Sequence, residues 1–242
     1  MTQTIDHRLP QLDERLRTAV ELVPPCEVCA DIGCDHGRFG TVLLAENRAQ
    51  CLLAADVSAK ALEKARARLN YLGFGERVTF AVADGLDALD ALPDGRADVI
   101  CVLGMGGDTV AGILQRGCER LHGATLVLGS QSLQETVRDA VQRIGYRLRE
   151  ERIAHADGRM YLLMRATPAL SDEPAYTEKE RLLGPCLLQS MPSEWRPWLE
   201  RKRRLLSAAV AAMESADLPK DAQRLALHKR ELQYTEETLR GL

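Results

Sequence analysis

The chain has 242 residues, of which 45% are hydrophobic and 28% charged, and its formal net charge is −3 with a pI near 6.0. This composition is typical of globular proteins and excludes collagen-like, mucin-like and mostly disordered chains, as well as a globally basic nucleic-acid binder. No apolar run approaches the ~20 residues of a membrane helix, and the polar segment Met1–Pro10 does not resemble a signal peptide. We therefore expect no membrane contact. Since cysteines such as Cys29, Cys51 and Cys101 lie in apolar runs, we also expect reduced thiols, no zinc site and a cytoplasmic location.

Short apolar runs in the first half of the chain predict buried β-strands. They are Glu27–Ile32, Gln50–Asp56, Val78–Ala83, Ala97–Leu103 and Thr125–Gly129. Helical patterns between or after them cover Arg38–Asn47, Ser58–Leu72 with Ser58 as N-cap, and Ser132–Ile144. Because apolar strands that alternate with helices belong to α/β folds, we expect a mostly parallel sheet covered on both faces.

Two later runs predict a β-hairpin. Arg147–Ala154 and Met160–Arg165 have the composition of strands and flank the turn signal His155–Gly158. The hairpin brings the expected number of strands to seven. We expect it to close the edge of the sheet with an antiparallel strand.

The proline-containing segment Thr167–Pro174 indicates a linker. Residues 1–173 contain 20 Lys and Arg against 25 Asp and Glu, whereas residues 174–242 contain 12 against 10. The composition thus becomes more basic after the linker. We therefore expect an α/β domain over residues 1–170 and a second domain over residues 171–242.

The second domain has only helical patterns. They cover Glu178–Leu188, Ser193–Ala216 and Pro219–Leu239, and Pro219 suits a first helical turn. Leucines recur every seven residues at 225, 232 and 239, and a facing stripe holds Leu205, Leu206, Val210 and Met213. This periodicity predicts a coiled-coil-like antiparallel hairpin. Whether the hairpin packs only on its own domain or contacts a substrate stays open.

The first chemical motif is the segment Ala30–Gly37, which follows a predicted strand and opens a helix. Gly33 and Gly37 let the backbone pass close to a ligand, and the helix start offers unpaired N–H groups. The spacing differs from that of dinucleotide-binding loops, and Asp35 inside the turn disfavours a pyrophosphate. An acidic residue in the turn suits a ligand with an ammonium group, such as the methionine end of S-adenosylmethionine.

Acidic residues also follow the next two predicted strands. Asp56 is placed to accept hydrogen bonds from a ribose diol, and Asp84, with Gly85, to accept from an adenine amino group. Carboxylates after successive parallel strands meet at one edge of the sheet and predict a ligand site there. The alternative is a set of ordinary loop acids and helix caps.

The segment Leu103–Asp108 has three glycines in four residues. Because a loop of this kind has few side chains, its backbone amides and carbonyls are able to hydrogen-bond to the edge of a base. The alternative is a tight strand-to-helix turn. Basic residues cluster at Arg201–Arg204, where we favour a phosphate-contacting patch over a solvated helix face. Trp195 and Trp198 either anchor the hairpin, which we favour, or stack on exposed bases.

These motifs together resemble those of the bacterial tRNA (adenine22-N1)-methyltransferases. Ala30–Gly37 (ADIGCDHG) is similar to the family's A-D-I-G-[ST]-D-H-[AG] motif, and Leu103–Gly107 (LGMGG) resembles its A-G-M-G-G loop. Val82–Leu86, Arg15-Leu16 and Asp157–Tyr161 also fit. A departure is Leu128–Gln131, where many members have a Gln-Pro-Asn or Ser-Pro-Gln type of sequence.

The resemblance implies a class I, Rossmann-like S-adenosylmethionine-dependent methyltransferase with a C-terminal helical hairpin, acting on N1 of adenine 22 in the D-arm region of tRNA. The implied partner is tRNA, with no metal, and we expect a monomer or a weak dimer. Rival hypotheses are a methyltransferase for another RNA position, a protein or a small molecule, and a non-catalytic RNA-binding adaptor. The site residues we predict are Asp35, His36 and Asp108 for catalysis; Asp31, Gly33, Asp35, Gly37, Asp56, Val57, Asp84, Gly85, Gly104 and Met105 for the cofactor; and Gly106, Gly107, Gln131, Arg201 and Arg204 for the substrate.

Overall fold

The computed structural model describes residues 9–215 and 221–242. The polar start of the chain up to residue 8, and the predicted first helical turn at Pro219, lie outside the described residues. The chain divides into two compact units, the first ending at Glu173 and the second beginning at Pro174.

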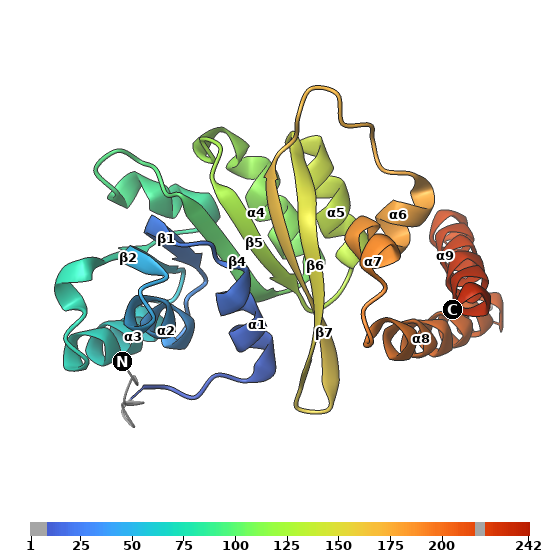
Figure 1. Cartoon of the computed structure of the whole chain (residues 1–242), viewed down its shortest axis with the longest axis horizontal. Helices are drawn as coiled ribbons and strands as arrows, with labels where there is room; N and C mark the ends of the chain where they lie inside the picture. The colour runs from blue at the N-terminus through green and yellow to red at the C-terminus, as the bar shows by residue number, and fades with distance from the viewer. Residues whose placement is uncertain (1–8, 216–220) are drawn as a thin grey trace. The chain divides into compact units, whose positions relative to one another are not determined.

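The first unit is built on a sheet with strand order β3-β2-β1-β4-β5-β7-β6 (Figure 1). Its strands are β1 (Cys26–Ile32), β2 (Ala49–Asp56), β3 (Val78–Val82), β4 (Val99–Met105), β5 (Thr125–Ser130), β6 (Tyr146–Ala156) and β7 (Arg159–Pro168). Strands β1 to β5 pair in parallel. The chain adds β2 and β3 on one side of β1 and then returns to add β4 and β5 on the other side, so the strand order reverses between β1 and β4. Ligands bind beyond the carboxyl ends of the strands at such a switch point.

Helices cover both faces of this sheet. They are α1 (Glu14–Leu22), α2 (Arg38–Ala45), α3 (Ala59–Tyr71), α4 (Gly107–Arg116) and α5 (Gln134–Arg143), with short 3-10 helices at Gly75–Arg77, Gly85–Ala91 and Cys118–Arg120. Helices α1, α2 and α3 pack on one face, and α4 and α5 pack on the other (Figure 1). Strand β4 is buried from Val99 to Leu103, which explains its unbroken apolar run. The expected parallel α/β sheet is therefore confirmed.

The hairpin of β6 and β7 forms one edge of the sheet, in an order that the sequence did not predict. Strand β7 pairs antiparallel with both β5 and β6, so the antiparallel strand lies inside the sheet and β6 forms the edge. The expectation that the hairpin closes the edge of the sheet with antiparallel pairing is therefore confirmed. The pairing partner of β5 is decided by packing against the rest of the sheet, which the hairpin's own sequence does not encode.

Two helix starts illustrate what local sequence encodes. Ser58 caps α3 as predicted, because its side chain accepts a hydrogen bond from Ala61 N at 3.2 Å. Helix α1 was not predicted, although Asp13 caps it by accepting from Leu16 N at 2.8 Å. Ala19 and Val20 of α1 are fully buried in the apolar core.

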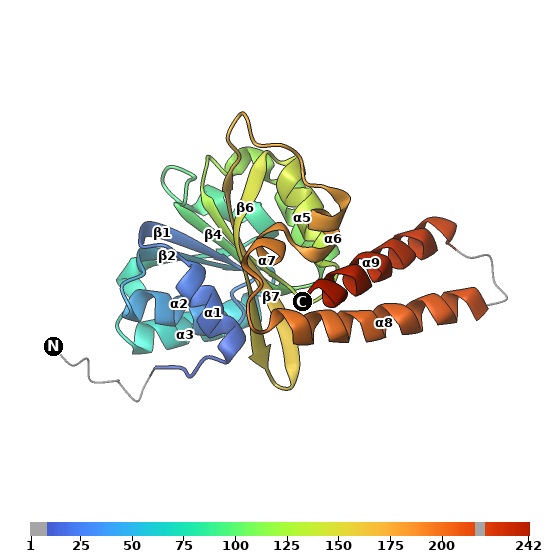
Figure 2. The ribbon, with the colours of Figure 1, turned by 45° about the vertical axis from the view of Figure 1, so that its right-hand side comes forward.

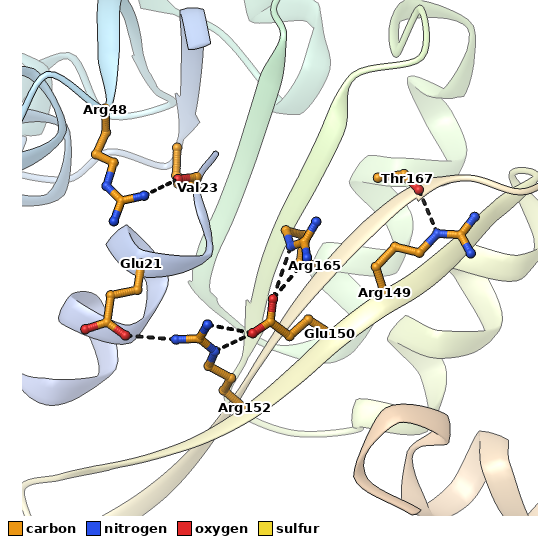
Figure 3. A network of polar contacts seen from close by, with 8 residues as sticks. All are labelled: Glu21, Val23, Arg48, Arg149, Glu150, Arg152, Arg165 and Thr167. Carbon is orange, nitrogen blue, oxygen red and sulfur yellow. Dashed lines mark hydrogen bonds and ion pairs between the residues drawn. The ribbon is translucent and has the colours of Figure 1, made fainter. Parts of the chain in front are cut away.

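A network of ion pairs ties α1 to the hairpin (Figure 3). Glu150 on β6 pairs with Arg152 at 2.6 Å and with Arg165 at 3.0 Å, and Arg152 also contacts Glu21 on α1 at 2.8 Å. Partial burial opposes ionisation of Glu150, but the hydrogen bonds from the two arginines prevail and lower its pKa. The network therefore links α1 to the β6–β7 hairpin, in addition to the apolar contacts of Ala19 and Val20.

The second unit consists of α6 (Glu178–Leu183), α7 (Pro185–Ser190), α8 (Trp195–Ser215) and α9 (Ala222–Gly241). The predicted helix Glu178–Leu188 is divided at Gly184, because Pro185 begins a new helix there. Helices α8 and α9 lie side by side and run in opposite directions, which confirms the predicted hairpin (Figure 2).

The buried seam of the hairpin is more polar than predicted. Leu206 is buried, but Leu205 is 58% exposed, so its place in the apolar stripe was wrong. On α9 the buried residues include Glu231, which pairs with Lys202 of α8, and Thr235. Adjacent residues on a helix face different directions, so only one of Leu205 and Leu206 is able to face α9. A seven-residue repeat of leucines does not by itself show which one does.

Candidate active site

A cavity of about 560 Å³ opens at the carboxyl ends of β1, β2 and β4 in the first unit. Many of the residues predicted for the site line it: Asp31, Gly33, Asp35, His36, Asp56, Val57, Asp84, Gly85, Gly104, Met105 and Gln131. A volume of this size is in the range of clefts that hold small molecules.

The loop after β1 forms the floor of this cavity. Gly33 N and Cys34 N both donate to Ala55 O, at 2.8 and 2.9 Å, which pins the loop to the end of β2. Gly33 has a φ of +79°, and a Cβ there would lie 2.1 Å from Met105 Cε. A side chain at this position would therefore displace Met105 and strain the turn.

Asp56 organises the loop from the neighbouring strand. One carboxylate oxygen accepts from Asp35 N at 3.0 Å, and the other accepts from Ser58 N at 2.8 Å. A carboxylate has about four acceptor positions, so Asp56 retains capacity for two hydroxyl donors of a ribose. The same side chain thus holds the turn, in which Asp35 adopts a φ of +48°, and faces the ligand cavity.

Asp31 has an unusual environment for a carboxylate. Its side chain is only 3% exposed, and Oδ2 has no hydrogen-bond partner among the described residues. Burial raises its pKa from 3.8 to about 7, and the nearby charges of Asp56 and Asp35 add to the effect. A buried carboxylate that lacks a partner and lines a cavity suits a cationic ligand group.

The far end of the cavity is more open. Asp84 is exposed and forms an ion pair with Arg116 at 3.3 Å. Val57, which is 69% exposed, and Gly85, with a φ of +59°, also line the cavity. An exposed apolar side chain with an adjacent acceptor suits a flat heterocycle that carries an amino group.

His36 is held between two charged groups. Its Nδ1 lies 3.4 Å from Asp35 Oδ2, and its Nε2 lies 3.2 Å from Lys64 Nζ. Because the lysine ammonium is only a donor, Nε2 accepts and Nδ1 carries the proton. These two contacts orient the ring where it lines the cavity.

Four residues that were predicted for the site, in the loops after β1 and β4 or at the helix starts that follow them, do not line the cavity. Gly37 caps α2, and Gly106 caps α4. Gly107 is buried, and a Cβ there would lie 2.5 Å from both Leu133 O and Ser132 O, so it allows α4 to pack on the loop before α5. Asp108 is exposed in the first turn of α4. The remaining two predicted residues, Arg201 and Arg204, lie on α8 in the second unit.

The structure adds lining residues that the sequence analysis did not assign: Arg15, Leu16, Ile32, Cys34, Arg38, Phe39, Ala83, Leu103, Thr109 and Ile113. Arg15 is the most informative of them, since its guanidinium lies 5.5 Å from the centre of the Tyr161 ring. The signal that could have found it is Asp13 followed by the amphipathic pattern of α1.

All seven cysteines are free thiols, and burial raises the pKa of Cys34, which keeps it protonated at neutral pH. Within residues 9–215 and 221–242, no group of three or more His, Cys, Asp or Glu side chains is arranged to hold a metal ion. In the same ranges no helix is both long and apolar enough to cross a membrane.

The sheet order, with antiparallel β7 next to β5, and the cavity at the ends of β1, β2 and β4 define a Rossmann-like fold of the class I methyltransferase type. Residues 12–164 match the family described as "Methyltransferase domain". The chain belongs to this family.

Several known proteins are similar to the whole chain. The tRNA (adenine(22)-N(1))-methyltransferase of Bacillus subtilis (strain 168) is 25% identical over 221 residues, which cover 89% of this chain and 91% of that protein. The crystal structure of the B. subtilis M1A22 tRNA methyltransferase TrmK matches with a TM-score of 0.83 at 24% identity, covering 95% of this chain and 99% of the other. The structure of M. capricolum TrmK in complex with the cofactor product S-adenosyl-homocysteine matches with a TM-score of 0.78 at 18% identity, covering 95% and 98%.

Proposed function

We propose that this protein transfers a methyl group from S-adenosylmethionine to N1 of adenine 22 in the D-arm region of tRNA. The observation that carries the proposal is the cavity that joins Asp31, Asp56 and Asp84 at one edge of a methyltransferase-type sheet. The similarity to the B. subtilis enzyme over 89% of the chain supports the choice of acceptor.

The residues of the cavity fit the cofactor. The unpartnered carboxylate of Asp31, together with Asp35, suits the ammonium of the methionine end. Asp56 is placed for the ribose hydroxyls, and Val57 and Asp84 for the adenine ring and its amino group. Gly33, Gly85 and Gly104 leave room for the ligand, and Met105 contributes an apolar side chain to the lining.

Methyl transfer to adenine N1 does not require a strong catalytic base. The bound cofactor supplies an electrophilic methyl group on a positively charged sulfur. Adenine N1 already has a lone pair, so the chain's task is to place the base and exclude water. Positive charge develops on the base during transfer, and acceptors at the rim such as Asp35 and Gly104 O are able to stabilise it. His36 keeps Asp35 in place.

For the second unit we propose a role in RNA binding. Arg204 is exposed and Arg201 is half-buried on α8, where guanidinium groups are able to contact phosphates. Trp195 is 1% exposed and Trp198 is 8% exposed, so neither side chain is available to stack on a base. We further propose that the protein acts in the cytoplasm as a monomer or a weak dimer.

The direct test is methyl transfer. The protein is incubated with S-adenosylmethionine and bulk unmodified tRNA, and the digested RNA is analysed by mass spectrometry. We expect 1-methyladenosine, mapped to position 22. A different methylated nucleoside would contradict the assignment of the base. Cofactor binding without any methylated RNA would favour a protein or small-molecule acceptor.

A further inference from the structure

Gln131 is held in a single orientation beside the cavity. Its side-chain Nε2 donates to Gly104 O at 2.8 Å, and its backbone N donates to Met105 O at 2.8 Å. A carbonyl oxygen only accepts, so the amide group must direct its NH2 end toward Gly104. The carbonyl end, Oε1, receives no hydrogen bond from the described residues.

The location of this amide is informative. Gln131 follows β5 and lines the same cavity as Gly104 and Met105, which end β4. The side chain is exposed, so Oε1 is accessible to an entering group. These residues end or follow β4 and β5, which lie on the opposite side of β1 from β2 and β3, the strands whose ends carry Asp56 and Asp84, which we assign to the cofactor.

We propose that Gln131 Oε1 accepts a hydrogen bond from the exocyclic amino group of the target base and thereby selects a 6-aminopurine. This inference rests on the proposed function and adds the group that recognises the base. The amino group is adjacent to the reacting N1 on the purine ring. A 6-oxopurine would instead place a carbonyl oxygen against Oε1, and two acceptors repel each other.

The same hydrogen bond favours the reaction as well as binding. When N1 acquires the methyl group, positive charge spreads to the amino group, whose N–H becomes a stronger donor. The bond to Oε1 is therefore stronger in the transition state than in the ground state, which is the condition for a contribution to kcat. The Gly104 anchor keeps Oε1 in position without reorganisation.

The test is a cycle of two proteins and two RNAs. Wild type and Gln131→Met are assayed on tRNA with adenine 22 and on the same tRNA with unsubstituted purine, which lacks the amino group. Purine N1 is intrinsically a weaker nucleophile, but this difference is common to both proteins and cancels in the ratio. We expect Gln131→Met to lower kcat/KM roughly tenfold or more on adenine and by much less on purine.

The controls separate recognition from structure. Gln115→Met changes an exposed glutamine on α4 that does not line the cavity, and we expect no loss on either RNA. Cofactor affinity and melting temperature of Gln131→Met should equal those of wild type, because the side chain is exposed. An equal loss on both RNAs would assign Gln131 to supporting the Gly104 loop and would overturn the inference. A wild-type protein that binds cofactor but methylates no adenine would overturn the proposed function, and the inference with it.

Discussion

The cavity has two halves that are built in different ways. The acidic half, Asp31, Asp56 and Asp84, comes from residues at or near the ends of three strands, and each carboxylate is found in the sequence by the apolar run that it ends or follows. The β4–β5 half consists of Gly104, Gln131 and Arg15. Gly104 and Gln131 are 27 residues apart and are joined by a hydrogen bond, and Arg15 comes from α1. The comparison indicates that the strand pattern of the sequence locates the acidic half, whereas the contacts of the β4–β5 half depend on tertiary packing that this pattern does not specify.

The largest expected effect is in the acidic half. Asp56→Ala removes the acceptors of Asp35 N and Ser58 N together with the proposed ribose contact. We expect the affinity for S-adenosylmethionine to fall roughly 100-fold or more, measured by calorimetry. The matched control is Asp94→Ala, an exposed carboxylate outside the cavity. Unchanged cofactor affinity in Asp56→Ala would refute the division of the cavity.

The second prediction concerns the pH dependence that Asp31 introduces. Its pKa is raised to about 7 in the folded chain, so its favourable contribution to stability is complete below pH ~4 and is lost as the pH rises toward 7. This loss amounts to up to about 4 kcal/mol in the ligand-free protein. Asp31→Asn removes this loss, so the variant should melt at a much higher temperature than wild type at pH 8, by a smaller margin at pH 5 and at a similar temperature at pH 4.

The same substitution should weaken cofactor binding, because a neutral amide does not attract the ammonium group. Wild-type affinity should therefore increase from pH 6 to pH 8, and the affinity of Asp31→Asn should be low at both. The measurement is thermal shift with and without S-adenosylmethionine across this range. A melting difference between the two proteins that is constant from pH 5 to pH 8 would contradict the assignment.

The sequence predicted the acidic half well and the β4–β5 half only in part. Asp31, Asp56 and Asp84 follow apolar runs whose identity as strands is set by local pattern. Arg15 was not assigned, because its position beside Gly104 depends on how α1 packs on the sheet.

Similar reasoning explains the other differences. The GMGG segment predicted a loop, but Gly107 serves the packing of α4 on Leu133, a residue far along the chain. The order of β7 and β6 and the exposure of Leu205 also depend on neighbours that a periodic pattern does not specify. Local rules therefore predicted elements and turns, and long-range packing decided their partners.

A smaller effect is expected from the basic residues of α8. The double change of Arg201 and Arg204 to Ala should weaken tRNA binding several-fold at moderate salt. It should also make the slope of log K against log salt shallower by about one for each phosphate that the variant no longer neutralises. Cofactor affinity should stay the same. Arg224→Ala, an exposed arginine near the start of α9, is the control. If it weakens binding as much as the double change does, tRNA responds to the general charge of the hairpin and not to this patch.

The smallest effect is expected from Glu150, which lies in neither half but holds the network beside α1 (Figure 3). Its lowered pKa means that its contribution to stability is present above pH ~4.5 and is lost as the pH falls through the folded value. Because the ion pairs are partly exposed, Glu150→Gln should cost less than about 1 kcal/mol of unfolding free energy, measured by urea denaturation at pH 7.

Cofactor affinity should not change, since the acidic half makes no contact with this network. Methylation should fall slightly, because Arg152 also contacts Glu21 of α1 and α1 carries Arg15 into the β4–β5 half. A loss of cofactor affinity in Glu150→Gln would show that the two halves are coupled through α1 and would contradict their separate contributions.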